Sequence, residues 1–161
     1  MISCFFIGHR ETDDQMLPAI VQAAEQLILN ERAEVFYVGA YGSFDRLAGE
    51  AILELKQKYP GILLYRVIPY HPAEHPVFAP LGFDGTFYPD GMESVSRRYA
   101  ISKANHKMIN ACDFLDLLCF QCRKQRLSSV GICQSQAEKR IDPGHQPGRE
   151  RVSTKKDTLA P

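Results

Sequence analysis

The chain has 161 residues, of which 45% are hydrophobic and 24% charged, and this composition is typical of one globular domain with its own core. It has no run of about 18 apolar residues and no signal-peptide pattern, so we expect a cytoplasmic protein without a membrane partner. The net charge of zero hides an asymmetry, because residues 1–118 carry 10 Lys and Arg against 15 Asp and Glu, whereas residues 119–161 carry 9 against 4. The acidic balance of the larger part argues against nucleic acid as a partner.

The chain opens with a nearly continuous apolar run, residues 2–7, which is typical of a central strand buried on both faces. A helix is predicted from Thr12 to about Glu31, because Thr12 and Gln15 have the spacing of a capping box. Pro18 either kinks this helix or marks its true first turn.

The next segment is a buried strand, a glycine turn and the start of a helix. Residues 35–38 form the strand, and Gly39 and Gly42 allow positive φ and close approach of a ligand to the backbone. Ser43 suits the N-cap of a helix that continues to Tyr59. A helix N-terminus behind a glycine turn is typical of a site for phosphate or another anion.

A third strand is predicted over residues 62–69. Three alternations of strand and helix indicate an α/β fold, with a mostly parallel sheet and helices on both faces in three layers, α/β/α. Residues 73–90 lack periodicity, and we interpret them as a long ordered loop, a candidate lid over the sheet edge. A helix over about 92–111 and a strand beginning at 113–115 follow. The inner stripe of that helix is predicted to contain Ile101, Ala104, Met108 and Cys112.

The pattern ends after about residue 115. Residues 119–161 are rich in Lys, Arg, Gln and Ser and have no sustained apolar period, so they are predicted to be a disordered basic tail. A second interpretation is a change of reading frame. Codons for residues 116–146 can be chosen so that a shift of one base encodes a strand, loop, helix and strand, and the gene sequence across codons 113–118 decides between the two. In either case residues 1–118 form a truncated domain whose C-terminal strands are missing or disrupted.

The five cysteines are an odd number at irregular spacing, which favours reduced thiols over disulfides in a chain without an export signal. Cys119 and Cys122 have a C-x-x-C spacing, but a zinc site needs a second paired set, which is absent from the sequence. We therefore predict no metal site.

Candidate site residues follow the predicted strands. Because the carboxyl ends of parallel strands meet at one edge, the segments 8–10, 39–46 and 70–72 are expected to lie together. Arg10 could clamp a phosphate or carboxylate, and His9 is either a turn residue or an acid/base group. Asp45 either binds a ribose hydroxyl or stabilises the helix N-terminus, the role we prefer. The candidate ligand-binding residues in these segments are Gly8, His9, Arg10, Gly39, Tyr41, Gly42, Ser43, Phe44 and Asp45.

Further candidates lie after the long loop. Glu93 and Arg97 are four residues apart, which fits a helix ion pair. The alternative makes Glu93 a catalytic carboxylate and Arg97 or Arg98 an anion clamp. Asn105 is a candidate hydrogen-bonding residue. The common nucleotide and hydrolase motifs G-x-G-x-x-G, the Walker lysine and G-x-S-x-G are absent from the sequence.

On these residues the chain resembles the SLOG superfamily, in its YpsA-like branch of small bacterial Rossmann-like proteins. The resemblance covers residue 1 to about 115 through the segments 4–10, 37–45 and 88–105. It implies a Rossmann-like fold and a site for a nucleotide or nucleotide-derived ligand. The residues that it implies to line the site are Gly8, Arg10, Gly39, Gly42, Ser43 and Asp45. The C-terminal third departs from the family pattern. Relatives elsewhere in the superfamily include cytokinin-activating phosphoribohydrolases and DNA-binding proteins of transformation.

The leading functional hypothesis is a sensor or regulatory module that binds a small nucleotide-like ligand, such as ADP-ribose, NAD or a nucleoside phosphate. The second is an enzyme that hydrolyses an N-glycosidic bond, with Glu93 as general acid or base and Arg10 and Arg97 holding a phosphate. A third is a truncated homologue without activity. No cofactor is identified, and the sequence leaves catalysis and a homo-oligomeric state open.

Overall fold

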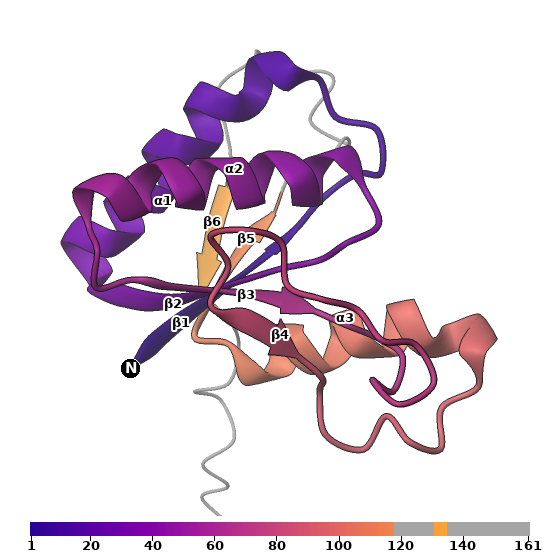
Figure 1. Cartoon of the computed structure of the whole chain (residues 1–161). Helices are drawn as coiled ribbons and strands as arrows, with labels where there is room; N and C mark the ends of the chain where they lie inside the picture. The colour runs from indigo at the N-terminus through magenta and orange to yellow at the C-terminus, as the bar shows by residue number, and fades with distance from the viewer. Residues whose placement is uncertain (118–130, 135–161) are drawn as a thin grey trace, which may run out of the picture.

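The structure is a computed structural model that describes residues 1–117 and 131–134 (Figure 1). Strands and helices alternate along most of the chain, as the sequence predicts. The strands are β1 (Ile2–Ile7), β2 (Ala33–Val38), β3 (Leu63–Val67), β4 (Gly85–Phe87), β5 (Phe114–Leu117) and β6 (Gly131–Gln134). The α-helices are α1 (Leu17–Glu31), α2 (Ser43–Lys58) and α3 (Ala100–Ala111), and two 3-10 turns cover Asp14–Met16 and Arg97–Tyr99.

The described strands form one sheet in the order β4-β3-β2-β1-β5-β6. The first five are parallel and β6 is antiparallel to β5. Helices α1 and α2 cover one face of the sheet and α3 covers the other (Figure 1). This is the predicted three-layer, Rossmann-like α/β fold. The chain adds β2, β3 and β4 on one side of β1 and then returns to place β5 on the other, and such a reversal is where ligands bind in open α/β sheets.

Each face of the sheet has its own apolar core. Phe6 and Phe36, with ring centroids 6.1 Å apart, face α1 and α2, whereas Phe5 faces α3 together with Met108. This alternation along β1 explains why the sequence run 2–7 is apolar almost throughout. The prediction that β1 is a central strand with both faces buried is therefore confirmed.

Two of the predicted thiols lie in these cores. Cys4 and Cys112 are both buried and neither is in a disulfide, as predicted. Burial raises the pKa of the Cys112 thiol to about 12, with a hydrogen bond to Ser3 opposing the shift, so this thiol stays protonated at neutral pH. Cys133 lies in β6, and Cys119 and Cys122 lie outside the described residues.

The predicted start of the first helix is wrong. Asp13, not Thr12, caps the first 3-10 turn by accepting a hydrogen bond from Gln15 N, and the Thr12 hydroxyl donates to the His9 carbonyl at 3.1 Å. The α-helix begins only at Leu17, with Pro18 in its first turn. The structure therefore supports the second alternative for Pro18, because a residue without an N–H fits the first turn of a helix and not its interior.

The segment between β3 and α3 also differs from the prediction. Instead of a loop throughout, it contains β4, which extends the sheet edge beside β3. Asp84 fastens this segment, because its Oδ2 accepts hydrogen bonds from Leu64 N at 2.7 Å and Lys56 Nζ at 2.5 Å. Burial tends to raise the pKa of Asp84, but these two donors outweigh it and hold the pKa below its ordinary value.

The third helix begins at Ala100 and not at about residue 92. Gly91 has a φ of +68°, in the left-handed region, and Ser96 has an extended ψ of 137°. The extended backbone at Ser96 lies inside the predicted helix and interrupts it, so residues 92–96 cannot share the face of α3. Of the predicted inner stripe, Ala104, Met108 and Cys112 are buried, whereas Ile101 is 37% exposed.

One strand of the tail is described. β6 pairs with β5, although the sequence predicts no strand there. The other predictions for the tail, disorder or a changed reading frame, fall on residues 118–130 and 135–161, which lie outside the described residues. Among the helices that the structure describes, none combines the length and hydrophobicity that a membrane span requires.

Candidate functional site

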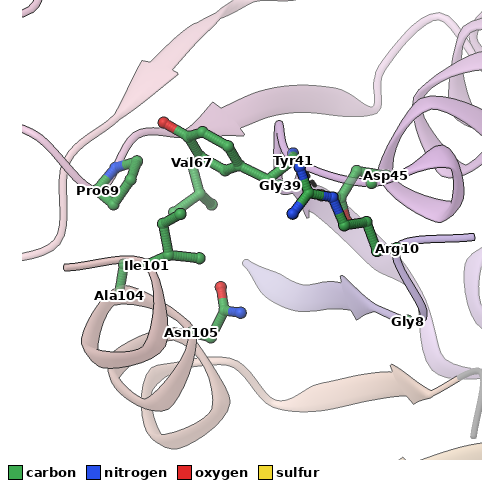
Figure 2. Close-up of a pocket in the computed structure, with 11 residues that line it drawn as sticks. Gly8, Arg10, Gly39, Tyr41, Asp45, Val67, Pro69, Ile101, Ala104 and Asn105 are labelled. Atoms are coloured by element: carbon green, nitrogen blue, oxygen red, sulfur yellow. Dashed lines mark hydrogen bonds between the residues drawn. The ribbon is translucent and has the colours of Figure 1, made fainter. Parts of the chain in front are cut away.

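A cavity of about 240 Å³ lies at the carboxyl ends of β1, β2 and β3, and α3 forms its opposite wall (Figure 2). It is formed by the segments that the sequence predicts to meet at this edge, together with part of α3. The residues that line it are Gly8, Arg10, Gly39, Tyr41, Gly42, Asp45, Val67, Pro69, Ile101, Ala104 and Asn105. Seven of the twelve candidate residues named from the sequence are therefore at one place.

Two polar side chains enter this cavity from different elements. Arg10 follows β1, and Asn105 projects from α3, and Figure 2 shows the guanidinium and the carboxamide directed into the same space. Arg10 is exposed and Asn105 is half-buried. A guanidinium offers five donors in a fixed plane, and a carboxamide both donates and accepts, so the pair can hold an anion and an uncharged polar group together.

The backbone of Arg10 is held by Ser43. The Arg10 carbonyl accepts hydrogen bonds from Ser43 N at 2.9 Å and Ser43 Oγ at 3.0 Å, and Thr12 N donates to Ser43 Oγ at 2.6 Å. The prediction that Ser43 is the N-cap of α2 is therefore wrong. Gly42 takes that position, and Ser43 instead joins α2 to the loop after β1. Ser43 is not among the residues that line the cavity.

Asp45 is bound to the turn that precedes its own helix. Its Oδ2 accepts a hydrogen bond from Tyr41 N at 2.9 Å, and Gly42 N–H also donates to the carboxylate. This geometry supports the preferred helix-stabilising role for Asp45, which resembles half of a capping box. Burial raises the pKa of Asp45 above its ordinary value, although hydrogen bonds from Tyr41 and Gly42 and the charge of Arg66 oppose the shift.

The glycines at this edge are needed for close packing and not for positive φ. A Cβ on Gly39 would lie 2.5 Å from Asp45 Oδ2, and one on Gly8 would lie 2.3 Å from the Phe44 ring. Gly39 and Gly42 do not use the positive φ that glycine allows, because among the described glycines only Gly82 and Gly91 adopt it. The groups that come close to the backbone at Gly39 and Gly8 are the side chains of Asp45 and Phe44, and not a ligand.

The backbone amides of the predicted anion turn are consequently already hydrogen-bonded to groups of the protein itself. The amides of Tyr41 and Gly42 donate to Asp45, and the amide of Ser43 donates to the Arg10 carbonyl. These three donors are the ones that a phosphate behind a glycine turn would use. In this conformation the cationic group that the cavity offers to a ligand is the Arg10 guanidinium.

Five candidates from the sequence lie outside the cavity lining. Phe44 is fully buried in the core beside Phe6, so its side chain cannot reach a ligand. His9 is exposed, and its carbonyl accepts the hydrogen bond from Thr12. The remaining three are Ser43, Glu93 and Arg97.

Glu93 and Arg97 do not form the predicted helix pair. Arg97 instead lies 3.7 Å from the carboxylate of Glu74, across the loop. The reason is that residues 92–96 precede the helix, so the spacing of four has no helical meaning there. Glu93 is exposed and is not among the lining residues, which removes the structural support for its proposed catalytic role.

The apolar wall was missed from the sequence. Val67 is the last residue of β3 and Pro69 follows it closely, and Ile101 and Ala104 belong to the predicted core stripe of α3. Ile101 was predicted to be part of the core stripe, but its side chain is 37% exposed and lines the cavity. Tyr41 completes this rim, and its ring meets the Tyr70 ring edge-on with centroids 6.5 Å apart.

Within the part of the chain that the structure describes, no group of three or more His, Cys, Asp or Glu side chains is arranged to hold a metal ion.

No protein-family model matches the chain, and comparison with curated proteins finds no significant match.

Proposed function

We propose that the protein binds a nucleotide or a nucleotide-derived ligand in the cavity at the carboxyl edge of the sheet and acts as a sensor or regulatory module. The observation that carries the proposal is the meeting of Arg10, Asn105 and an apolar wall in one cavity of a Rossmann-like fold. Such folds bind ligands beyond the carboxyl ends of their strands. We also propose that the chain is a member of the YpsA-like branch of the SLOG superfamily, for which the resemblance implies a ligand of this class.

The lining provides a partner for each part of such a ligand. The Arg10 guanidinium suits a phosphate, and the Asn105 carboxamide suits a sugar hydroxyl or a base edge. The side chains of Val67, Pro69 and Ile101 and the ring of Tyr41 provide the apolar surface on which a base could pack. The cavity volume of about 240 Å³ lies just below the usual range of about 300–1,000 Å³, which favours a small ligand.

Hydrolysis of an N-glycosidic bond is less well supported. Its general acid or base, Glu93, lies outside the cavity lining. Of the described residues that line the cavity, Asp45 alone carries a carboxylate, and that carboxylate is bound to the turn amides. A binding module needs no such group, so binding is the simpler function for this geometry.

The test is a calorimetric titration of the purified full chain with AMP, ADP-ribose and NAD. Replacing Arg10 with alanine should weaken binding of the ligand that the wild type prefers by at least about tenfold, because hydrogen bonds to charged groups contribute about 1.5–3 kcal/mol. The matched control is Arg98→Ala, since Arg98 is an exposed arginine outside the cavity lining. Equal binding by Arg10→Ala and Arg98→Ala, or no binding of any of the three compounds by the wild type, would contradict the proposal.

A further inference from the structure

Asp45 occupies a position in which a Rossmann-like site usually places the negative charge of its ligand. Its carboxylate lines the cavity and accepts the amide hydrogens of Tyr41 and Gly42. These amides belong to a glycine turn in front of a helix of 16 residues, a setting that favours an anion through both its donors and the helix dipole. In this protein the anion is part of the chain.

The surroundings of Asp45 are shaped to hold the carboxylate there. Gly39 leaves room for it, because any side chain at that position would begin 2.5 Å from Asp45 Oδ2. The carboxylate is half-buried, and three groups act on its charge: the two amides and the more distant Arg66. A ligand phosphate at the turn would have to displace a group that is already well bound and negatively charged.

The charges of the cavity therefore balance before a ligand enters. Among the described lining residues, Arg10 is the cation and Asp45 the anion. A single phosphate can bind the Arg10 guanidinium without displacing the Asp45 carboxylate from the amides of the turn. A pyrophosphate extends further than a single phosphate and carries negative charge on both of its phosphorus centres, so in a cavity of about 240 Å³ its second phosphate is expected to approach the like charge of Asp45.

We propose that Asp45 determines the specificity of the site, by excluding pyrophosphate groups from the turn and admitting ligands with a single phosphate. This inference rests on the proposed function and narrows its ligand class, favouring nucleoside monophosphates over ADP-ribose and NAD. In this proposal the amides of the glycine turn bind the carboxylate of Asp45 and not a phosphate of the ligand.

The direct test is titration of inorganic pyrophosphate into the full-length wild type and Asp45→Asn. Asparagine has the same shape, and its amide oxygen can still accept the Tyr41 hydrogen bond, so the variant removes the charge and keeps that hydrogen bond to the turn. Asp45→Asn should bind pyrophosphate at least tenfold more tightly than the wild type. The matched control is Asp113→Asn, because Asp113 also accepts a backbone hydrogen bond but lies at the opposite edge of the sheet. If Asp45→Asn unfolds, Asp45→Ser removes the same charge and serves in its place.

A second titration compares AMP with ADP-ribose. The wild type should prefer AMP, and Asp45→Asn should reduce that preference at least tenfold. Equal pyrophosphate affinity of Asp45→Asn and the wild type would overturn the inference, even if nucleotides bind and the proposed function stands. A gain of pyrophosphate binding by Asp45→Asn, with no nucleotide binding by the wild type, would support the role of Asp45 and contradict the proposed function.

Discussion

At the scale of single residues, the packing of the sheet edge that carries the cavity requires glycine at positions where a side chain lies against the backbone. Gly8 follows β1, and the Phe44 ring from α2 lies directly over it in the core. Phe44 is fully buried, and its ring also packs beside that of Phe6 with centroids 6.5 Å apart. The ring therefore cannot move away cheaply, and Gly8 is required for packing at this edge.

Replacing Gly8 with alanine should lower the free energy of unfolding by about 1–3 kcal/mol, because the new methyl group would overlap a fully buried ring. Urea denaturation measures the change. Gly61→Ala is the matched control, since a Cβ at Gly61 meets no atom within 4 Å and should change little. The double variant Gly8→Ala/Phe44→Leu should recover part of the loss. If both single variants have equal stability, the packing argument is wrong.

At the scale of elements, α1 and α2 are joined by a hydrogen-bonded cluster on the outer side of the molecule. Glu25 Oε1 accepts hydrogen bonds from Lys58 Nζ at 2.6 Å and the Tyr59 hydroxyl at 2.8 Å. The bond from Lys58 is the main cause that lowers the pKa of Glu25 below its ordinary value of 4.5, and the bond from Tyr59 adds to it. The ionised form of Glu25 is thus favoured in the folded state.

This shift predicts a pH dependence of stability. Because the folded-state pKa lies below the unfolded one, the contribution of Glu25 is present above pH 4.5 and is lost as the pH falls through the folded-state value. Glu25→Gln should therefore melt at a lower temperature than the wild type at about pH 7, and the difference should shrink as the pH falls below 4.5. The control is Glu54→Gln, an exposed glutamate on α2. A difference that persists at low pH would exclude ionisation as its cause.

The position of helix starts is the element-level feature that the sequence predicts least well. Both α1 and α3 begin later than their capping and charge patterns indicate, at Leu17 and Ala100. In each case a 3-10 turn precedes the helix, so the polar residues taken as first-turn partners lie before it. The shift at α3 alone removes Glu93 from the predicted site, because the orientation of a side chain depends on which residue starts the helix.

At the scale of the whole molecule, β1 and β5 bring together residues that are far apart in the chain. At the amino-terminal edge of the sheet, Asp113 Oδ2 accepts hydrogen bonds from Ser3 N at 2.8 Å and Ser3 Oγ at 2.9 Å. Above them, Cys4 to Ile7 pair in register with Phe114 to Leu117. This contact closes the return of the chain across β1 and so fixes α3, which carries one wall of the cavity.

Asp113→Ala should lower the free energy of unfolding by about 1–2 kcal/mol, which is less than usual for bonds to a charged group because the carboxylate is exposed. Chemical denaturation of the full chain provides the measurement. Asp90→Ala, which removes another exposed carboxylate, should leave stability unchanged within error. Equal effects of the two substitutions would mean that charge, and not the link between β1 and β5, is responsible.

The sequence by itself determined the fold class and the edge at which the site lies. Apolar runs at 2–7, 35–38 and 62–69 separated by helical patterns leave few solutions other than a parallel sheet covered on both faces. Parallel strands carry their following loops to one edge, so Arg10 and the turn before α2 had to meet there. These conclusions depend on local periodicity, which the sequence contains directly.

Only the tertiary structure decided what the residues at that edge do. It directed the carboxylate of Asp45 and the hydroxyl of Ser43 to backbone groups within the protein, and it packed the Phe44 ring against Gly8. It also brought Ile101 and Asn105 across the sheet to form the far wall. The physical reason is that hydrogen-bond partners and burial depend on contacts between segments distant in the chain, and a local pattern of residue types does not specify them.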